Sequence, residues 1–282
     1  MRTAICISGH VRWYKDLLRN FYDMVYLPFQ ELGEVDIFLH IWTDVNSNNS
    51  VSTACGDTIQ TLDKINFEEI NSIFNPVDII VEDYDIIKDR FDVNKFYSEK
   101  EVAAWDGSNS TRVQPCIPMF YKWFECNKLK KKHEKLNNFE YDWVMKCRLD
   151  VFYFEPIKPS TWDNNNVYNR LSADDTILFS SSKNIDIITN IYPNIKRLAE
   201  KYNLHCCWEG AADLLKYQLI DNNMKWEDFK NLGETAYWLY PRATFYETCE
   251  YLFKREDRLE DCAKVLFKYA DDFKTFPNPL KD

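Results

Sequence analysis

The stretch Tyr141-Asp142-Trp143-Val144-Met145-Lys146-Cys147-Arg148-Leu149-Asp150-Val151-Phe152-Tyr153 decides the fold. Its apolar residues up to Cys147 predict a short buried strand that ends near Arg148 and Asp150. Side chains two residues apart on an extended chain point the same way. Burying an unpaired carboxylate costs several kcal/mol, so we expect Asp150 to meet a cation, either Arg148, a lysine or a divalent metal. A purely structural Arg148–Asp150 pair explains these residues equally well.

Two further apolar runs open the chain and are joined by a helical pattern. Residues 3–8 predict a strand, residues 14–29 carry the apolar period of a helix ending at Pro28, and residues 35–42 are apolar at nearly every position. The order strand, helix, strand predicts a parallel sheet covered on both faces. Ligands of such sheets bind beyond the carboxyl ends of the strands.

The rest of the chain continues this alternation. We expect helices at 62–74, 119–136, 185–202 (with a break near Pro193) and 211–222, strands at 77–81, 174–180 and 235–240, and a loop in the Asn- and Asp-rich residues 163–169. We find no internal repeat, linker or low-complexity segment. The sequence therefore predicts a single α/β domain over residues 1–282, with a mostly parallel central sheet flanked by helices.

Composition narrows the functional classes. The formal charge of −10 and the pI near 5.0 argue against a nucleic-acid-binding surface, because phosphate contacts need a basic face. The one dense basic run, Lys128 to Lys135, is typical of a solvated helix end. We therefore expect no nucleic acid partner.

The cysteines and the apolar runs indicate the compartment. Nine scattered cysteines, with Cys206 and Cys207 adjacent, do not form a disulfide pattern and predict free buried thiols in a reducing compartment. The apolar run after Met1 is too short for a signal peptide, and no 18-residue apolar segment occurs. We expect a soluble protein without membrane insertion, in the cytoplasm of the producing or host cell.

Three blocks of sequence carry a family resemblance. They are Ile5 to Arg12, Asp36 to Trp42, and Tyr141 to Asp150. Together they resemble the nucleotide-sugar glycosyltransferases of the A-type fold, of the kind that bacteria and large DNA viruses such as chloroviruses use to build surface glycans, and within that group the chlorovirus xylosyltransferases. The resemblance spans about residues 3 to 242. It implies a nucleotide-binding half at about 1–153 and an acceptor half at about 154–282.

The resemblance implies a chemistry and a metal. In the family a divalent cation bridges the donor diphosphate to an Asp-x-Asp motif. The corresponding residues here are Arg148-Leu149-Asp150, so the first carboxylate of the motif is replaced. Only Asp150 is carried over as a ligand for Mn²⁺ or Mg²⁺, and one carboxylate holds such an ion weakly. Arg148 could itself neutralise the diphosphate, because an arginine fork suits phosphate oxygens. The implied partners are a nucleotide sugar, UDP-linked rather than GDP-linked and with xylose as the expected sugar, and an oligosaccharide or glycoprotein acceptor.

Individual residues receive expected roles. A first strand ending in Ser-Gly with a basic residue nearby can present backbone N–H groups and a cation to a phosphate, and an acidic and aromatic strand end can meet a nucleotide base. The expected donor-binding residues are Ser8, Gly9, His10, Arg12, Asp83, Tyr84, Arg148, Asp150 and Arg242. The expected acceptor-binding residues are Trp208, Trp238 and Tyr240.

An inverting transfer also needs a carboxylate that takes the proton of the acceptor hydroxyl. Glu209 is the first choice because it follows Trp208, whose indole could stack on a sugar; Asp213 and Asp175 are the reserves. The helix dipole near Glu209 is a sufficient structural explanation for that carboxylate. Two other functions remain open, a nucleotide-sugar-binding or glycan-binding module without turnover, and a glycan hydrolase that pairs Asp150 with Asp174 or Asp175.

Overall fold

A computed structural model describes most of the chain. The described residues are 1–12, 14–43, 64–103, 116–169, 176–204, 209–225, 228–232, 237–239, 254, 258–269 and 271–272. Their main feature is a seven-stranded sheet of order β3-β2-β1-β4-β7-β6-β8. Its strands lie between residues 2 and 231 of the sequence.

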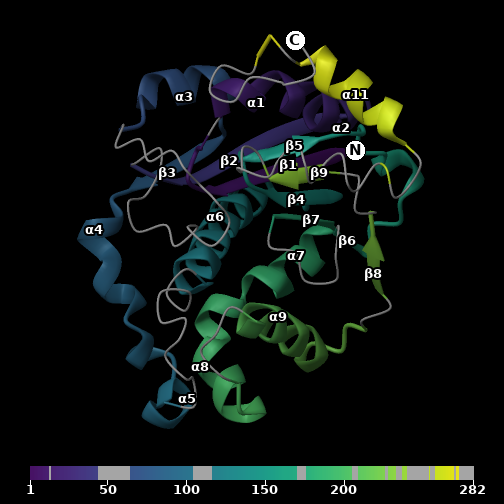
Figure 1. The fold of residues 1–282 in the computed structure, drawn as a ribbon. Coiled ribbons are helices and arrows are strands. Elements are labelled where there is room, and N and C mark those ends of the chain that lie inside the picture. Colours follow the sequence, from purple (N-terminus) through teal and green to yellow (C-terminus); the bar gives the residue numbers. More distant parts are fainter. Residues whose placement is uncertain are drawn as a thin grey trace.

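Four parallel strands form one half of this sheet (Figure 1). They are β1 (Arg2–Gly9), β2 (Glu34–Trp42), β3 (Asp78–Glu82) and β4 (Trp143–Cys147). β1 lies between β2 and β4, with Ile5 opposite both Ile37 and Met145. Because the strands are parallel, their carboxyl ends all meet at one edge of the sheet.

The other half of the sheet is mixed. β7 (Ile177–Ser180) runs antiparallel to both β4 and β6 (Val167–Asn169), and β8 (Phe229–Asn231) pairs parallel with β6. A separate two-stranded sheet joins β5 (Val151–Tyr153) to β9 (Tyr237–Leu239) in antiparallel pairing. The expected fold class, α/β with a mostly parallel central sheet flanked by helices, is confirmed.

Helices cover both faces of the sheet (Figure 1). One face carries α1 (Tyr14–Phe21), a π-helical turn (Tyr22–Tyr26), α2 (Leu27–Gln30), α3 (Phe67–Phe74) and α11 (Leu259–Lys268). The other carries α6 (Cys116–Asn137), α7 (Ser182–Thr189), α8 (Ile191–Tyr202) and α9 (Glu209–Asp221). Short pieces complete the described helices: α4 (Tyr84–Ile87), α5 (Glu99–Ala103) and 3₁₀ turns at Lys88–Phe91, Val93–Lys95 and Pro159–Thr161.

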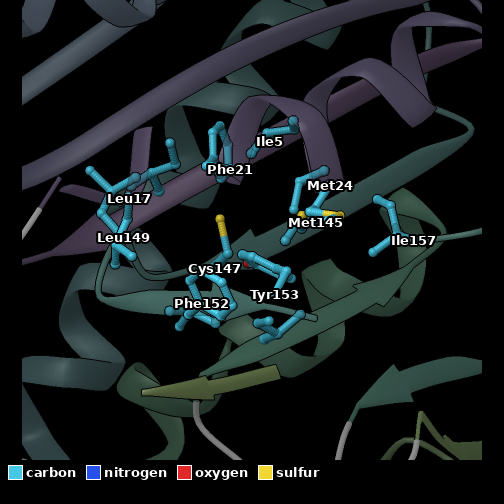
Figure 2. Close-up of a cluster of buried hydrophobic side chains, with 14 of the residues drawn as sticks. Ile5, Leu17, Phe21, Met24, Met145, Cys147, Leu149, Phe152, Tyr153 and Ile157 are labelled. Atoms are coloured by element: carbon cyan, nitrogen blue, oxygen red, sulfur yellow. The ribbon is translucent and has the colours of Figure 1, made fainter. Parts of the chain in front are cut away.

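Alternation along the strands divides the core into two clusters. Ile5 and Ile7 of β1 face α1, whereas Ala4 and Cys6 face α6. Figure 2 shows part of the first cluster, in which β1 and β4 side chains meet those of α1, the π-helical turn and the 149–157 segment. The described cysteines 6, 126 and 147 are free and buried, as expected, and Cys116 and Cys262 are also buried.

Two prolines lie within a few residues of the helix boundaries that the sequence suggested. The helix does not end at Pro28, because a π-helical turn precedes it and Pro28 occupies the first turn of α2, where its missing N–H costs little. The break in the 185–202 region falls at Asn190, between α7 and α8. Pro193 likewise sits in the first turn of α8.

Two other expectations are wrong. Residues 163–169 are not all loop, since Val167–Asn169 forms β6, a strand too short to show periodicity in the sequence. The basic run is not all solvated, because Lys130 is fully buried. Its ammonium lies 2.8 Å from Asp186 and 3.2 Å from Glu134, and these ion pairs offset the cost of burying the charge.

Candidate functional site at the carboxyl edge of the sheet

The carboxyl ends of β1, β2 and β4 bring together residues far apart in the sequence. β1 ends at Gly9, whose φ of +111° lies in the region that favours glycine. A Cβ atom added to Gly9 would meet nothing within 4 Å, so open space adjoins the backbone there. Gly9 thus lets the chain turn and leaves room for a ligand at the edge where α/β sheets bind them.

A guanidinium–carboxylate cluster lies at this edge. Arg148 donates from Nε to Asp150 Oδ1 at 2.8 Å and from Nη2 to Asp150 Oδ2 at 2.5 Å. Arg12, three residues after Gly9, places Nη1 3.9 Å from the same Oδ2. The side chains of Asp150, Arg12 and Arg148 are 7%, 12% and 24% exposed. The residues after β1 and β4 therefore form one site, and Arg148 is its most accessible charged group.

The surroundings of Asp150 bear on the expected metal. Both carboxylate oxygens accept hydrogen bonds from Arg148, and a second guanidinium lies beside them. A divalent cation there would have to displace or approach two positive groups, so this donor set fits an arginine fork better than Mn²⁺ or Mg²⁺. Among the described residues no group of three or more His, Cys, Asp or Glu side chains is placed to hold a metal ion. The metal-ligand role of Asp150 stays a prediction.

A second charged network lies at the ends of β2 and β3. Glu82 accepts hydrogen bonds from His40 at 2.7 Å, Tyr121 at 2.9 Å and Lys122 at 3.2 Å. Burial opposes the charged form of Glu82, but these donors and the Lys122 charge outweigh it and lower the pKa of Glu82 to about 2. Burial also lowers the pKa of His40. His40 is thus a buried strand histidine that is hydrogen-bonded through Nε2.

Two buried lysines stand over tryptophan rings near this edge. Lys122 Nζ lies 3.5 Å from the centre of the Trp42 ring, and Lys146 Nζ lies 3.8 Å from that of Trp123. Both lysines are 1% exposed. Basic side chains therefore gather at this edge of an acidic protein: Arg12, Lys122, Lys146 and Arg148. Asp150 and Glu82 offset part of this charge, and burial lowers the pKa of Lys122 to about 7, so the arginines carry the permanent positive charge.

Two hydroxyl groups at the strand ends lack a protein partner. Ser8 Oγ in β1 and Thr43 Oγ1 after β2 are buried and have no hydrogen-bond partner among the described residues. Buried polar atoms are nearly always paired, so an unpaired one requires an explanation, such as a ligand. Both hydroxyls lie beside the edge that carries the arginines.

Three other expected donor-binding residues, His10, Asp83 and Tyr84, lie near the same edge. The His10 ring is centred 6.3 Å from Trp42, and Tyr84 packs edge-on against Trp42 at 5.3 Å and stacks on Phe91. Asp83 accepts a hydrogen bond from the backbone N–H of Asp85 and so caps α4. The structure brings these residues near the ends of β1 to β3, but their role in donor binding stays a prediction.

The structure describes few of the expected catalytic and acceptor-binding residues. Asp213 is half-buried in α9. Glu209 is the first residue of that helix, but the structure describes only its backbone. Trp238 lies in β9, where only the backbone is described. The remaining residues fall outside the described ranges: Asp174, Asp175, Trp208, Tyr240 and Arg242.

Sequence reasoning missed three residues of the site, Glu82, Lys122 and Lys146. Two of them stand among apolar neighbours: Lys122 lies between Tyr121 and Trp123 on α6, and Lys146 lies inside a buried strand. A lysine inside an apolar segment must find a partner, and this pattern could have identified both. Glu82 simply ends an apolar run, and nothing local distinguishes it.

The chain is thus an α/β protein in which the basic side chains of Arg12 and Arg148 lie at the carboxyl ends of parallel strands, a candidate site for an anionic ligand. No family model and no curated protein matches the chain. Among solved structures, the apo form of mouse xyloside xylosyltransferase 1 is similar over 82% of this chain and 84% of that chain, at 9% identity and a TM-score of 0.37. No helix in the described part of the chain is long and apolar enough to cross a membrane.

Proposed function

We propose that the protein is a glycosyltransferase that moves a sugar from a nucleoside diphosphate to an acceptor hydroxyl. One observation carries the proposal: the guanidinium groups of Arg12 and Arg148 converge at the carboxyl ends of β1 and β4, next to the open space at Gly9. A diphosphate is the anion that an arginine fork and a glycine turn at this position suit best. The sequence blocks that resemble the glycosyltransferases contain these same residues.

The chemistry explains why cations are needed there. The acceptor oxygen bonds to the anomeric carbon as the bond from that carbon to the diphosphate oxygen breaks, and the bonding electrons leave with the nucleoside diphosphate. Negative charge grows on the leaving oxygen, so positive groups held nearby stabilise the transition state. Arg148 and Arg12 supply this charge in the proposal. Asp150 acts as a positioning residue that fixes the plane of the Arg148 fork.

The finer assignments belong to the same proposal. Glu209 takes the acceptor proton, with Asp213 and Asp175 as reserves, and Trp208, Trp238 and Tyr240 contact the acceptor. A UDP-sugar, with xylose as the first sugar to test, is the donor, and an oligosaccharide or glycoprotein is the acceptor. Mn²⁺ or Mg²⁺ remains a candidate helper, but the donor set at Asp150 leads us to expect that the arginines suffice.

Release of nucleoside diphosphate tests the proposal. The protein is incubated with UDP- and GDP-sugars, with and without xylo- and gluco-oligosaccharide acceptors, in EDTA and then in MnCl₂. We expect release that requires the acceptor and persists in EDTA. Tight nucleotide-sugar binding without release would instead establish a binding module, and cleavage of the oligosaccharide without nucleotide would establish a hydrolase. Activity that EDTA abolishes and Mn²⁺ restores would contradict the arginine-only account.

A further inference from the structure

A cavity lined by aromatic side chains lies away from the carboxyl edge. It measures about 240 Å³ and is bounded by the 153–158 segment, the start of the 3₁₀ region, and strands β6, β7 and β8. Its apolar wall includes Trp162, Tyr168 and Phe179. Its rim includes Glu155, Lys158 and Asn231. Phe179 and Tyr168 are buried, and Trp162 is the most accessible of the three rings. The cavity therefore combines one accessible aromatic ring with hydrogen-bond donors and acceptors at its rim.

The cavity is separate from the candidate transfer site. The Trp162 ring, on its wall, lies 6.4 Å from that of Trp143, the first residue of β4, whereas Arg148 and Asp150 follow the last residue of that strand. The chain leaves the carboxyl edge after β4 and returns to the π-helical turn, where the Ile157 N–H donates to Met24 O at 2.9 Å. Phe179 of the wall pairs with Met145, three residues before Arg148, and Tyr153 follows Asp150 by three residues, so roughly 10 Å of extended chain separates the wall from the arginine cluster.

The aromatic wall is rigid. Trp162 and Tyr168 stack with ring centres 4.6 Å apart and planes at 16°, and Phe179 meets Trp162 edge-on at 5.7 Å. The Tyr168 hydroxyl accepts a hydrogen bond from the Asp163 N–H at 2.9 Å, which fixes the ring further. A pre-formed wall of this kind binds a ligand without a large ordering cost.

The rim is polar without a strong net charge. Glu155 is held by Arg258, whose Nη2 lies 2.5 Å from Oε1, so the carboxylate has a fixed place and a matched charge. Lys158 and Asn231 are exposed at the mouth. Among the described residues at the rim, the positive charge of Arg258 is matched by Glu155, and a wholly apolar molecule would bury the rim groups unpaired.

From this composition we infer that the cavity is a saccharide-binding site for one ring of a neutral glycan. A sugar ring presents C–H groups along one face, which pack on the negative face of an aromatic ring, and hydroxyl groups around its edge, which need mixed donors and acceptors. The cavity offers both in one place. A glycan held here would be anchored at a distance from the transfer site, so the inference goes beyond the proposed function.

Binding without nucleotide tests the inference. Saturation-transfer NMR and titration of tryptophan fluorescence are run with xylobiose, cellobiose and maltose at millimolar concentrations. We expect at least one of the three disaccharides to bind. Trp162→Ala removes the stacking face and should weaken binding by about tenfold or more. Asn231→Ala and Lys158→Ala change exposed rim residues, leave the core intact, and should weaken binding by about threefold to tenfold.

Two controls separate this site from the transfer site. Lys196→Ala alters an exposed lysine of α8 and should leave sugar binding unchanged. Arg148→Lys should also leave it unchanged, whether or not the protein transfers sugar, so failure of the proposed function does not affect this outcome. Absence of binding by all three disaccharides, or binding that survives both Trp162→Ala and the rim substitutions, would overturn the inference.

Discussion

At the scale of single residues, Arg148 and Asp150 act as a unit. The sequence indicated that they point the same way, and the structure shows a two-point hydrogen-bonded pair joined by Arg12 from another part of the chain. A purely structural role for Arg148 and Asp150 would produce the same hydrogen-bonded pair. What favours a binding role is the position of the pair at the strand ends near the open space at Gly9, where Ser8 and Thr43 also place hydroxyls with no partner among the described residues.

The role of the Arg148 guanidinium can be tested with a substitution that keeps the positive charge but removes the planar arrangement of hydrogen-bond donors. Arg148→Lys retains a positive group but loses the planar fork, and we expect kcat to fall roughly 100-fold, as when one transition-state donor is removed. The matched control is Arg197→Lys, which alters an arginine paired with Asp221 between α8 and α9. Steady-state kinetics should show near-normal turnover for the control. Equal losses in both variants would assign the Arg148 effect to general instability.

Glu82 predicts a response to acid. Its pKa of about 2 in the folded protein lies below the ordinary value of 4.5, so the stability it contributes is present above pH 4.5 and is lost as the pH falls towards 2. Because the side chain is partly exposed, the loss should be at most on the order of 3 kcal/mol. Glu82→Gln should be less stable at pH 7 and lose less stability on acidification. Urea unfolding at a series of pH values measures both, and parallel curves for the two proteins would contradict the assignment.

At the scale of elements, two glycines allow a matched comparison. Gly9 (φ +111°) ends β1 beside open space, whereas Gly33 (φ +153°) precedes β2 and a Cβ there would lie 2.0 Å from Met1 O. Gly9→Ala and Gly33→Ala should each destabilise the protein by about 1–3 kcal/mol through backbone strain, with an added clash at Gly33. Only Gly9→Ala should also weaken UDP binding.

Calorimetric titration with UDP and urea unfolding of both variants check this comparison, provided that each is studied below its unfolding transition. Equal UDP affinity in Gly9→Ala and the parent protein would show that the open space at Gly9 is not part of the nucleotide site.

Left-handed helix ends give a second prediction at this scale. Asn75 after α3 and Asn203 after α8 adopt φ values of 39° and 52°, conformations that glycine adopts without a Cβ penalty. Asn203→Gly should therefore leave stability unchanged or raise it slightly, whereas Asn203→Ala should lower it by about 1 kcal/mol. Thermal unfolding of the two variants compares them directly. An Asn203→Ala variant more stable than the Asn203→Gly variant would contradict this account of how Asn203 ends α8.

The sequence predicts strands and helices well where they are long enough for burial to produce a recognisable apolar pattern. β1, β2 and α6 were evident because their apolar runs are long, but β6 has three residues and no detectable period. The break expected near Pro193 occurs three residues earlier, at Asn190, and the helical segment expected to end at Pro28 continues to Gln30, because a proline in a first helical turn removes no hydrogen bond. Local sequence does not reveal whether a proline begins a helical segment or interrupts one.

At the scale of the whole molecule, the site depends on contacts that no local pattern encodes. Arg12 and Asp150 are 138 positions apart and meet only because β1 and β4 are neighbours in the sheet. Lys122 reaches Glu82 because α6 packs across β2. The sequence therefore predicted the edge at which ligands bind and several residues there, but the pairing of charges across elements required the structure.

The central claim is that the diphosphate of a nucleotide sugar binds between Arg12 and Arg148 at the carboxyl ends of β1 and β4. A crystal structure of the protein soaked with UDP, once in EDTA and once in MnCl₂, tests it most directly. We predict that in both crystals phosphate oxygens lie within hydrogen-bond distance of Arg148 and beside Gly9. A diphosphate bound elsewhere, or bound to Asp150 only through Mn²⁺ with Arg148 turned away, would contradict the account.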